Sequence, residues 1–158
     1  MPKLSAAILL FRHGPGGGLE VFLVHPGGPF WAKKDLGAWS LPKGEYGPDE
    51  EPLRAALREF EEETGFRLEA STLFPLGELK QPSGKIVTAW AAEKDVDPAV
   101  VKSNLFEMEW PPKSGKLGEF PEVDRAGWFS LDLAREKLLK GQTGFLDRLM
   151  DKLEMRSG

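Results

Sequence analysis

The sequence contains no cysteine among its 158 residues. This absence excludes disulfide bonds, thiolate zinc sites, iron–sulfur clusters and a cysteine nucleophile. Histidine is nearly as scarce, because only His13 and His25 are present, and their spacing fits no histidine metal motif. Both lie near the ends of apolar segments, where we expect them at the surface. Any metal chemistry in this chain must therefore use oxygen ligands.

Long apolar runs and a strong excess of one charge are also missing. The longest apolar run, residues 6–11, is far below the ~18 residues that a membrane-spanning helix needs. No signal peptide is recognisable after Lys3, so a cytoplasmic protein without a membrane partner is expected. The net charge of −4 argues against binding nucleic acid or an anionic membrane through bulk charge.

Strand and helix patterns are mixed along the chain, without an internal repeat or a long linker. The length and this order predict one layered domain over residues 1–158, with its core at about 4–153, of the α/β or α+β class. Residues 111–121 are expected to form a loop. Strands are expected at 4–12, 20–25, 39–41, 76–81, 85–92, 103–110 and 127–129, and helices at 52–64, 131–140 and 145–153.

The helix expected at residues 52–64 carries a concentration of carboxylates. We expect Asp49 to cap its beginning and Gly65 to end it. At helical spacing, three glutamates share one face, beside an apolar face suited to the core. Such a face is often no more than a solvated surface. The alternative is a site for Mg²⁺ or Mn²⁺, which would offset the repulsion between the three carboxylates of Glu59, Glu62 and Glu63.

The spacing around this helix matches the pattern GX5EX7REUXEEXGU, in which U is a bulky apolar residue. Its specified positions are filled by Gly44, Glu50, Arg58, Glu59, Phe60, Glu62, Glu63, Gly65 and Phe66. This pattern is the Nudix box, so the sequence resembles the Nudix hydrolase family over these 23 residues. The resemblance implies that family's α/β/α sandwich with a mixed central sheet.

The resemblance also implies the chemistry. Nudix hydrolases cleave a nucleoside diphosphate linked to another group, with Mg²⁺ or Mn²⁺ held by the box helix. By this resemblance Arg58 and Glu50 pair to orient the carboxylates, as residues behind the metal ligands often do. The implied metal ligands are Glu59, Glu62 and Glu63, which are also the catalytic carboxylates, together with the carbonyl of Gly44.

Two segments outside the box look like their counterparts in diadenosine tetraphosphate hydrolases. Residues 39–44 look like the entry to the box in those enzymes, where Lys43 is placed to contact a phosphate. Glu122 lies six residues before Trp128, where an acidic residue approaches the metal ions, so the general base is either Glu122 or a box glutamate. Trp31 or Trp39 is a candidate to stack on a nucleobase, with core packing as the alternative.

Two classes of function stay open from the sequence. The first is a metal-dependent pyrophosphohydrolase, for which a dinucleoside polyphosphate or related nucleotide is favoured over a nucleoside triphosphate and over a 5′-triphosphorylated RNA end. The second is a binding module that senses a nucleotide without hydrolysing it. The complete set of box carboxylates favours the enzyme. We expect it to act as a monomer or a homodimer, without a nucleic-acid partner.

Overall fold

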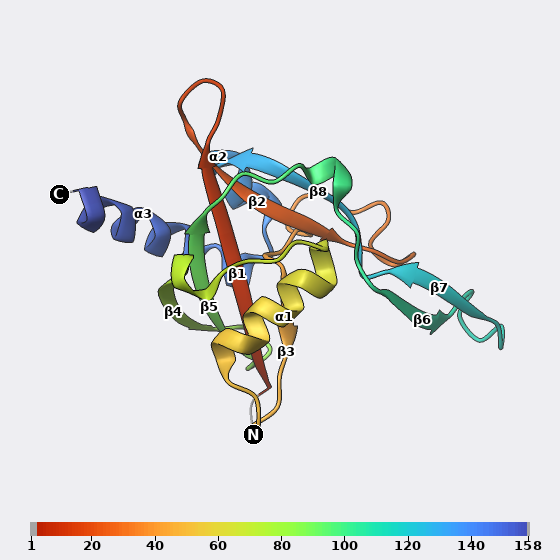
Figure 1. Ribbon diagram of the computed structural model, residues 1–158. Coiled ribbons are helices and arrows are strands. Elements are labelled where there is room, and N and C mark those ends of the chain that lie inside the picture. The colour runs from red at the N-terminus through yellow and green to blue at the C-terminus, as the bar shows by residue number, and fades with distance from the viewer. Residues whose placement is uncertain (1–2, 158) are drawn as a thin grey trace.

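The computed structural model describes residues 3–157, so both ends of the expected 1–158 domain lie outside the described residues. A six-stranded mixed sheet forms the centre, and a two-stranded hairpin projects from it (Figure 1). The strands are β1 (Leu4–His13), β2 (Leu19–Pro26), β3 (Lys43–Glu45), β4 (Phe74–Lys80), β5 (Ile86–Glu93), β6 (Leu105–Glu109), β7 (Leu117–Pro121) and β8 (Val123–Ser130). The α-helices are α1 (Pro52–Thr64), α2 (Leu131–Lys137) and α3 (Gly144–Ser157), and short 3₁₀ helices cover Ala70–Thr72, Pro98–Val100 and Lys140–Gln142.

Strand β1 lies at the centre because it is apolar on both faces, as a strand covered on both sides must be. The sheet order is β4-β5-β1-β2-β8, and β5 runs parallel to β1 over residues 4–11. The other edge of β1 is divided, since β3 pairs with residues 5–7 and β2 with residues 11–13. This division places Lys43 and Gly44, where the box begins, directly against the central strand.

Helices cover both faces of the sheet (Figure 1). On one face, α1 packs Ala56 and Phe60 against Ile8 and Leu10. On the other face, α2 and α3 pack against a cluster around Leu9. Each large apolar side chain buried in this way stabilises the fold by about 1.5–3 kcal/mol. The predicted α/β/α sandwich with a mixed central sheet is confirmed.

Some predicted boundaries were wrong. Residues 39–41 make only isolated bridges, to Val24 and Leu138, and the strand that follows begins at Lys43. Residues 117–121, expected in a loop, form β7, because pairing with β6 outweighs the loop-like composition of this segment. Helix α2 ends at Lys137 rather than residue 140, since Leu138 is extended and buried.

The helix caps and one histidine also differ from expectation. Glu51, and not Asp49, precedes α1 as its N-cap, and its side chain makes no capping hydrogen bond. Pro52 lacks a backbone N–H and so needs no cap there. Gly65 ends the helix as predicted, with φ of 84° and its N–H donating to the carbonyl of Glu61. His25 is fully buried, because the loop after β2 folds back over it.

Candidate active site

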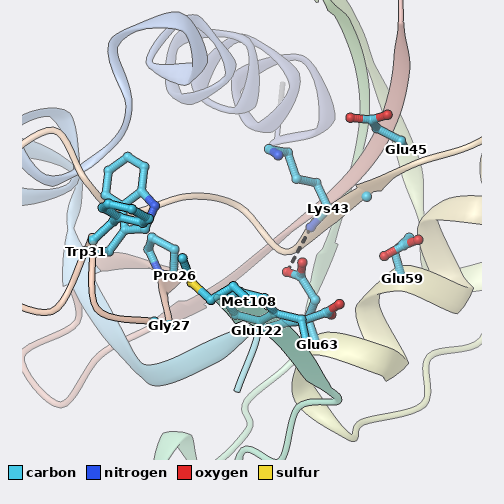
Figure 2. Close-up of a pocket in the computed structure, with 13 residues that line it drawn as sticks. Pro26, Gly27, Trp31, Lys43, Glu45, Glu59, Glu63, Met108 and Glu122 are labelled. Carbon is cyan, nitrogen blue, oxygen red and sulfur yellow. Dashed lines mark hydrogen bonds between the residues drawn. The ribbon is translucent and has the colours of Figure 1, made fainter. Parts of the chain in front are cut away.

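A cleft of about 640 Å³ lies where the start of the box meets the projecting hairpin (Figure 2). Its two sides differ in chemistry. Trp31 lies on one side, away from the carboxylates of Glu59 and Glu63 that reach in from α1. The charged side is lined by Lys43, Gly44, Glu45, Glu59, Glu63 and Glu122, and the apolar side by Pro26, Gly27, Gly28, Phe30, Trp31, Phe106 and Met108.

Gly44 and Glu59 are in close contact at the charged side. A Cβ atom added to Gly44 would overlap the Glu59 carboxylate, so this position needs glycine for that carboxylate to lie where it does. The Glu59 side chain is only 13 % exposed. Burial raises its pKa, and the nearby charge of Glu62 adds to the rise, while the bond from Arg58 opposes it.

Arg58 forms hydrogen bonds with three carboxylates of the box. Its guanidinium donates to both oxygens of Glu50, at 2.8 Å each, and also to Glu59 at 2.8 Å and Glu62 at 3.2 Å. These bonds raise the pKa of Arg58 and lower that of Glu50. The predicted Arg58–Glu50 pair is therefore formed, and Arg58 holds two further carboxylates of α1 in place.

Glu63 is the most strongly perturbed carboxylate of the cleft. Burial raises its pKa to about 8, and the charges of Glu59 and Glu122 contribute to the rise. The backbone N–H of Lys43 donates to Glu63 Oε1 at 3.2 Å (Figure 2). Burial also lowers the pKa of the Lys43 side chain. A half-buried acid and a half-buried base thus share the charged side.

Glu122 reaches the cleft from the turn between β7 and β8. Burial raises its pKa, followed by repulsion from Glu59 and Glu62. The backbone N–H of Gly27 donates to the Glu122 carbonyl at 2.9 Å, which ties this turn to the loop after β2. Glu122 therefore lines the same cleft as Glu59 and Glu63.

The donor set suits a hard divalent cation. All candidate ligands are carboxylate or carbonyl oxygens. The charge of Glu59 raises the pKa of both Glu63 and Glu122, and a cation would relieve this repulsion. Within residues 3–157, no three acidic or histidine side chains are already gathered as a metal cage. The carboxylates of Glu59 and Glu62 are instead turned toward Arg58.

The two tryptophan candidates are placed differently. Trp31 lines the cleft, with the Lys34 ammonium 5.1 Å from its ring. Trp39 is only 5 % exposed and donates from Nε1 to Asp35 at 2.8 Å. It packs against Phe129 in the core, so the expectation that Trp39 could stack on a base was wrong.

The apolar side also contains residues that sequence reasoning missed. Phe106 and Met108 alternate along β6 and face the cleft, while Glu107 between them is exposed. The alternation was visible in the sequence. The direction in which the apolar face points depends on how the hairpin packs against Gly28. The positive φ of 95° at Gly28 and its close approach to Phe106 could not be predicted from the sequence.

Comparison with known proteins supports the resemblance to the Nudix family. A family model described as the NUDIX domain matches residues 1–149. No curated protein matches the chain. None of the helices described in residues 3–157 is long and apolar enough to cross a membrane.

Solved structures share the fold at low identity. An Ap4A hydrolase from C. elegans in a binary complex superposes with a TM-score of 0.65 at 21 % identity, covering 95 % of this chain and 98 % of that one. The NUDIX domain of Shewanella oneidensis NrtR, complexed with ADP ribose, gives 0.67 at 18 %, covering 97 % and 89 %. A MutT/nudix family protein from Enterococcus faecalis gives 0.59 at 20 %, where the match covers 82 % of this chain and 44 % of that longer one. With the family model matched over residues 1–149, the chain belongs to the Nudix family.

Proposed function

We propose that this protein hydrolyses a phosphoanhydride bond in a nucleoside diphosphate linked to another group, using Mg²⁺ or Mn²⁺. The observation that carries the proposal is the cleft itself, which is lined by three half-buried carboxylates of raised pKa and a half-buried lysine. Perturbed groups of this kind gather at catalytic sites. Glu59, Glu62 and Glu63, with the carbonyl of Gly44, are the residues that would hold the cation.

Each remaining residue of the charged side has a task in this proposal. A bound divalent cation supplies charge neutralisation at the phosphates and lowers the pKa of water. Lys43 binds a phosphate oxygen, and Arg58 with Glu50 keeps Glu59 and Glu62 oriented. Glu122 or Glu63 accepts the proton of the attacking water, because burial gives both a higher affinity for protons than an exposed carboxylate has.

The apolar side of the cleft supports a nucleotide as substrate. Trp31, Phe106 and Met108 offer a surface for a flat, uncharged ring, while phosphates belong beside Lys43. A dinucleoside polyphosphate or a related nucleotide has both parts. The C. elegans Ap4A hydrolase, which is named for a dinucleoside polyphosphate, shares this fold. A cytoplasmic location and action as a monomer or homodimer complete the proposal.

A substrate panel tests this function. Diadenosine tetraphosphate, nucleoside triphosphates, ADP-ribose and 5′-triphosphorylated RNA are compared by kcat/KM with Mg²⁺ and with Mn²⁺. Hydrolysis in ¹⁸O-labelled water locates the cleaved bond. We expect the highest kcat/KM for diadenosine tetraphosphate or another dinucleotide, and none without a divalent cation. Binding of nucleotides without turnover of any of them would identify a sensing module instead.

A further inference from the structure

A buried histidine lies between two segments that line the cleft. The ring of His25 has no exposed surface. His25 lies outside the Nudix box and does not line the cleft. Its Nδ1 lies 2.8 Å from Oδ1 of Asp124, in β8, and its Nε2 lies 2.7 Å from the backbone carbonyl oxygen of Lys34. One side chain therefore connects β8 with the loop between β2 and β3.

The two connected segments carry residues of opposite sides of the cleft. Lys34 closes a turn with Trp31, since its backbone N–H donates to the Trp31 carbonyl at 3.0 Å. Asp124 lies two residues after Glu122 in the chain. The His25 ring is thus the side-chain link between the turn that presents Trp31 and the segment that presents Glu122.

The two partners of His25 determine where hydrogens must lie on its ring. A carbonyl oxygen only accepts, so Nε2 of His25 must carry a hydrogen to bond Lys34. Nδ1 faces a carboxylate oxygen, and a bare nitrogen beside an ionised carboxylate would leave two lone pairs facing each other. A hydrogen must therefore lie between Nδ1 and Asp124. Removing the Asp124 carboxylate therefore takes away the hydrogen bond that holds the ring to β8.

The groups around the link hold the ring in one orientation. Trp39 packs edge-on against it, with ring centroids 5.1 Å apart. Arg125 lies 3.9 Å from the Asp124 carboxylate and also covers the ring of Trp39. A ring packed in this way has little freedom to find another partner, so its two hydrogen bonds set the position of the Lys34 carbonyl.

We propose that His25 is a positioning residue, with Asp124 as its partner. It fixes the turn that carries Trp31 at a set distance from Glu122, so that the apolar and charged sides of the cleft fit one substrate together. His25 itself touches no substrate. This role rests on the proposed function, because it concerns how the cleft binds a nucleotide.

Substitutions of Asp124 test the role without emptying the core, because that side chain is 31 % exposed while His25 is fully buried. Asp124→Ala removes the partner of Nδ1. Asp124→Asn keeps one, since its amide donates to bare Nδ1 while Nε2 retains the hydrogen that bonds Lys34. The matched control is His13→Ala, which removes an exposed histidine 3.5 Å from Glu93 and outside this cleft.

The first readout is amide hydrogen exchange over residues 27–38, without metal or nucleotide. The second is KM and kcat for the best nucleotide substrate. We expect Asp124→Ala to speed exchange by about tenfold and to raise KM by about tenfold, with kcat within about threefold. Asp124→Asn and His13→Ala should stay within about twofold of the parent in both readouts. General unfolding would instead lower kcat through loss of active protein.

Three results would overturn the role. Asp124→Ala could leave exchange or KM unchanged, Asp124→Asn could behave like Asp124→Ala, or kcat alone could fall. Failure of the proposed function is recognised separately. A parent protein that hydrolyses no nucleotide refutes the function and the substrate role with it, whereas faster exchange in Asp124→Ala would still establish that His25 fixes the loop.

Discussion

At Glu63, the proposed chemistry needs an ionised carboxylate, whereas the folded protein favours the protonated one. Its carboxylate is half-buried in the cleft, where loss of solvent raises the pKa from 4.5 to about 8. The unfolded chain releases this proton at its ordinary pKa, while the folded protein keeps it. Between these two values only the folded state is protonated, so the free energy of unfolding must fall as pH rises.

Glu63→Gln should remove this fall in the metal-free protein. Between pH 4.5 and about 8, we expect the parent to lose stability with a slope that approaches about 1.4 kcal/mol per pH unit, relative to the variant. Urea denaturation at a series of pH values in the presence of a chelator measures both. Parallel curves for the two proteins would show that Glu63 ionises in the folded state as easily as in water.

Gly44 tests how closely the box carboxylates must be placed. Gly44→Ala puts a methyl group where the Glu59 carboxylate lies, whereas Gly47→Ala meets no atom within 4 Å. A displaced catalytic group commonly costs about 100-fold in rate, so we expect Gly44→Ala to lower kcat/KM by roughly that factor. Gly47→Ala should keep the parent rate. Equal kinetics of the two variants, measured with saturating Mg²⁺, would contradict the role of Gly44.

Prediction from sequence succeeded at the residue scale where a local period decides the outcome. Arg58 and Glu62 are four residues apart on one helix, so their contact follows from helix geometry. His25 and Trp39 could not be placed in this way. Both are buried beneath an irregular loop, which contacts His25 through the Lys34 carbonyl and Trp39 through Asp35, and no periodic pattern describes such a loop.

At the scale of elements, most strands of the central sheet could be predicted from the sequence. Of the projecting hairpin, β6 was predicted and β7 was not. β1 is buried on both faces and reads as one apolar run. β7 contains glycine and proline, and it is a strand because it pairs with β6, starting at Leu105 and Pro121. Its existence depends on a neighbour, which is why the sequence of residues 117–121 alone predicted a loop.

Helix α3 provides a prediction at the same scale, because it closes an edge of the sheet. Nη1 of Arg148 donates to the carbonyls of Leu76 and Glu78 in β4, at 2.9 and 2.8 Å, on either side of Gly77. Arg148→Ala should lower the free energy of unfolding by about 1–3 kcal/mol, since two carbonyls lose a charged donor. Arg54→Ala is the matched control, because that side chain is 82 % exposed. Equal urea midpoints for both variants would show that Arg148 does not hold the edge strand.

At the scale of the whole molecule, the acidic character is concentrated rather than spread. Seven of the 25 acidic residues lie within residues 49–63, against two of the 21 basic ones. The remainder of the chain is close to neutral. The charge that first argued against a polyanionic ligand thus belongs to one helix and its approach, where a divalent cation would reverse its effect on phosphates.

This concentration predicts that metal binding stabilises the protein. Ligands that bind only the folded state raise its stability by mass action. We expect millimolar Mg²⁺ or Mn²⁺ to raise the thermal midpoint of the parent by a few degrees, about 2–4 °C per kcal/mol for a chain of this size. Glu59→Gln should reduce the rise. An equal rise with K⁺ at the same ionic strength would assign the effect to general screening.

In the proposed function, the carboxylates facing the cleft perform metal-dependent hydrolysis. Glu63→Gln and Glu61→Gln make the same chemical change on one helix, but Glu61 is half-exposed and pairs with Arg67 outside the cleft. The most direct measurement is kcat of both variants on the best nucleotide substrate, with Mg²⁺. We predict a loss of at least about 100-fold for Glu63→Gln and parent activity for Glu61→Gln. Full activity in Glu63→Gln would contradict the claim.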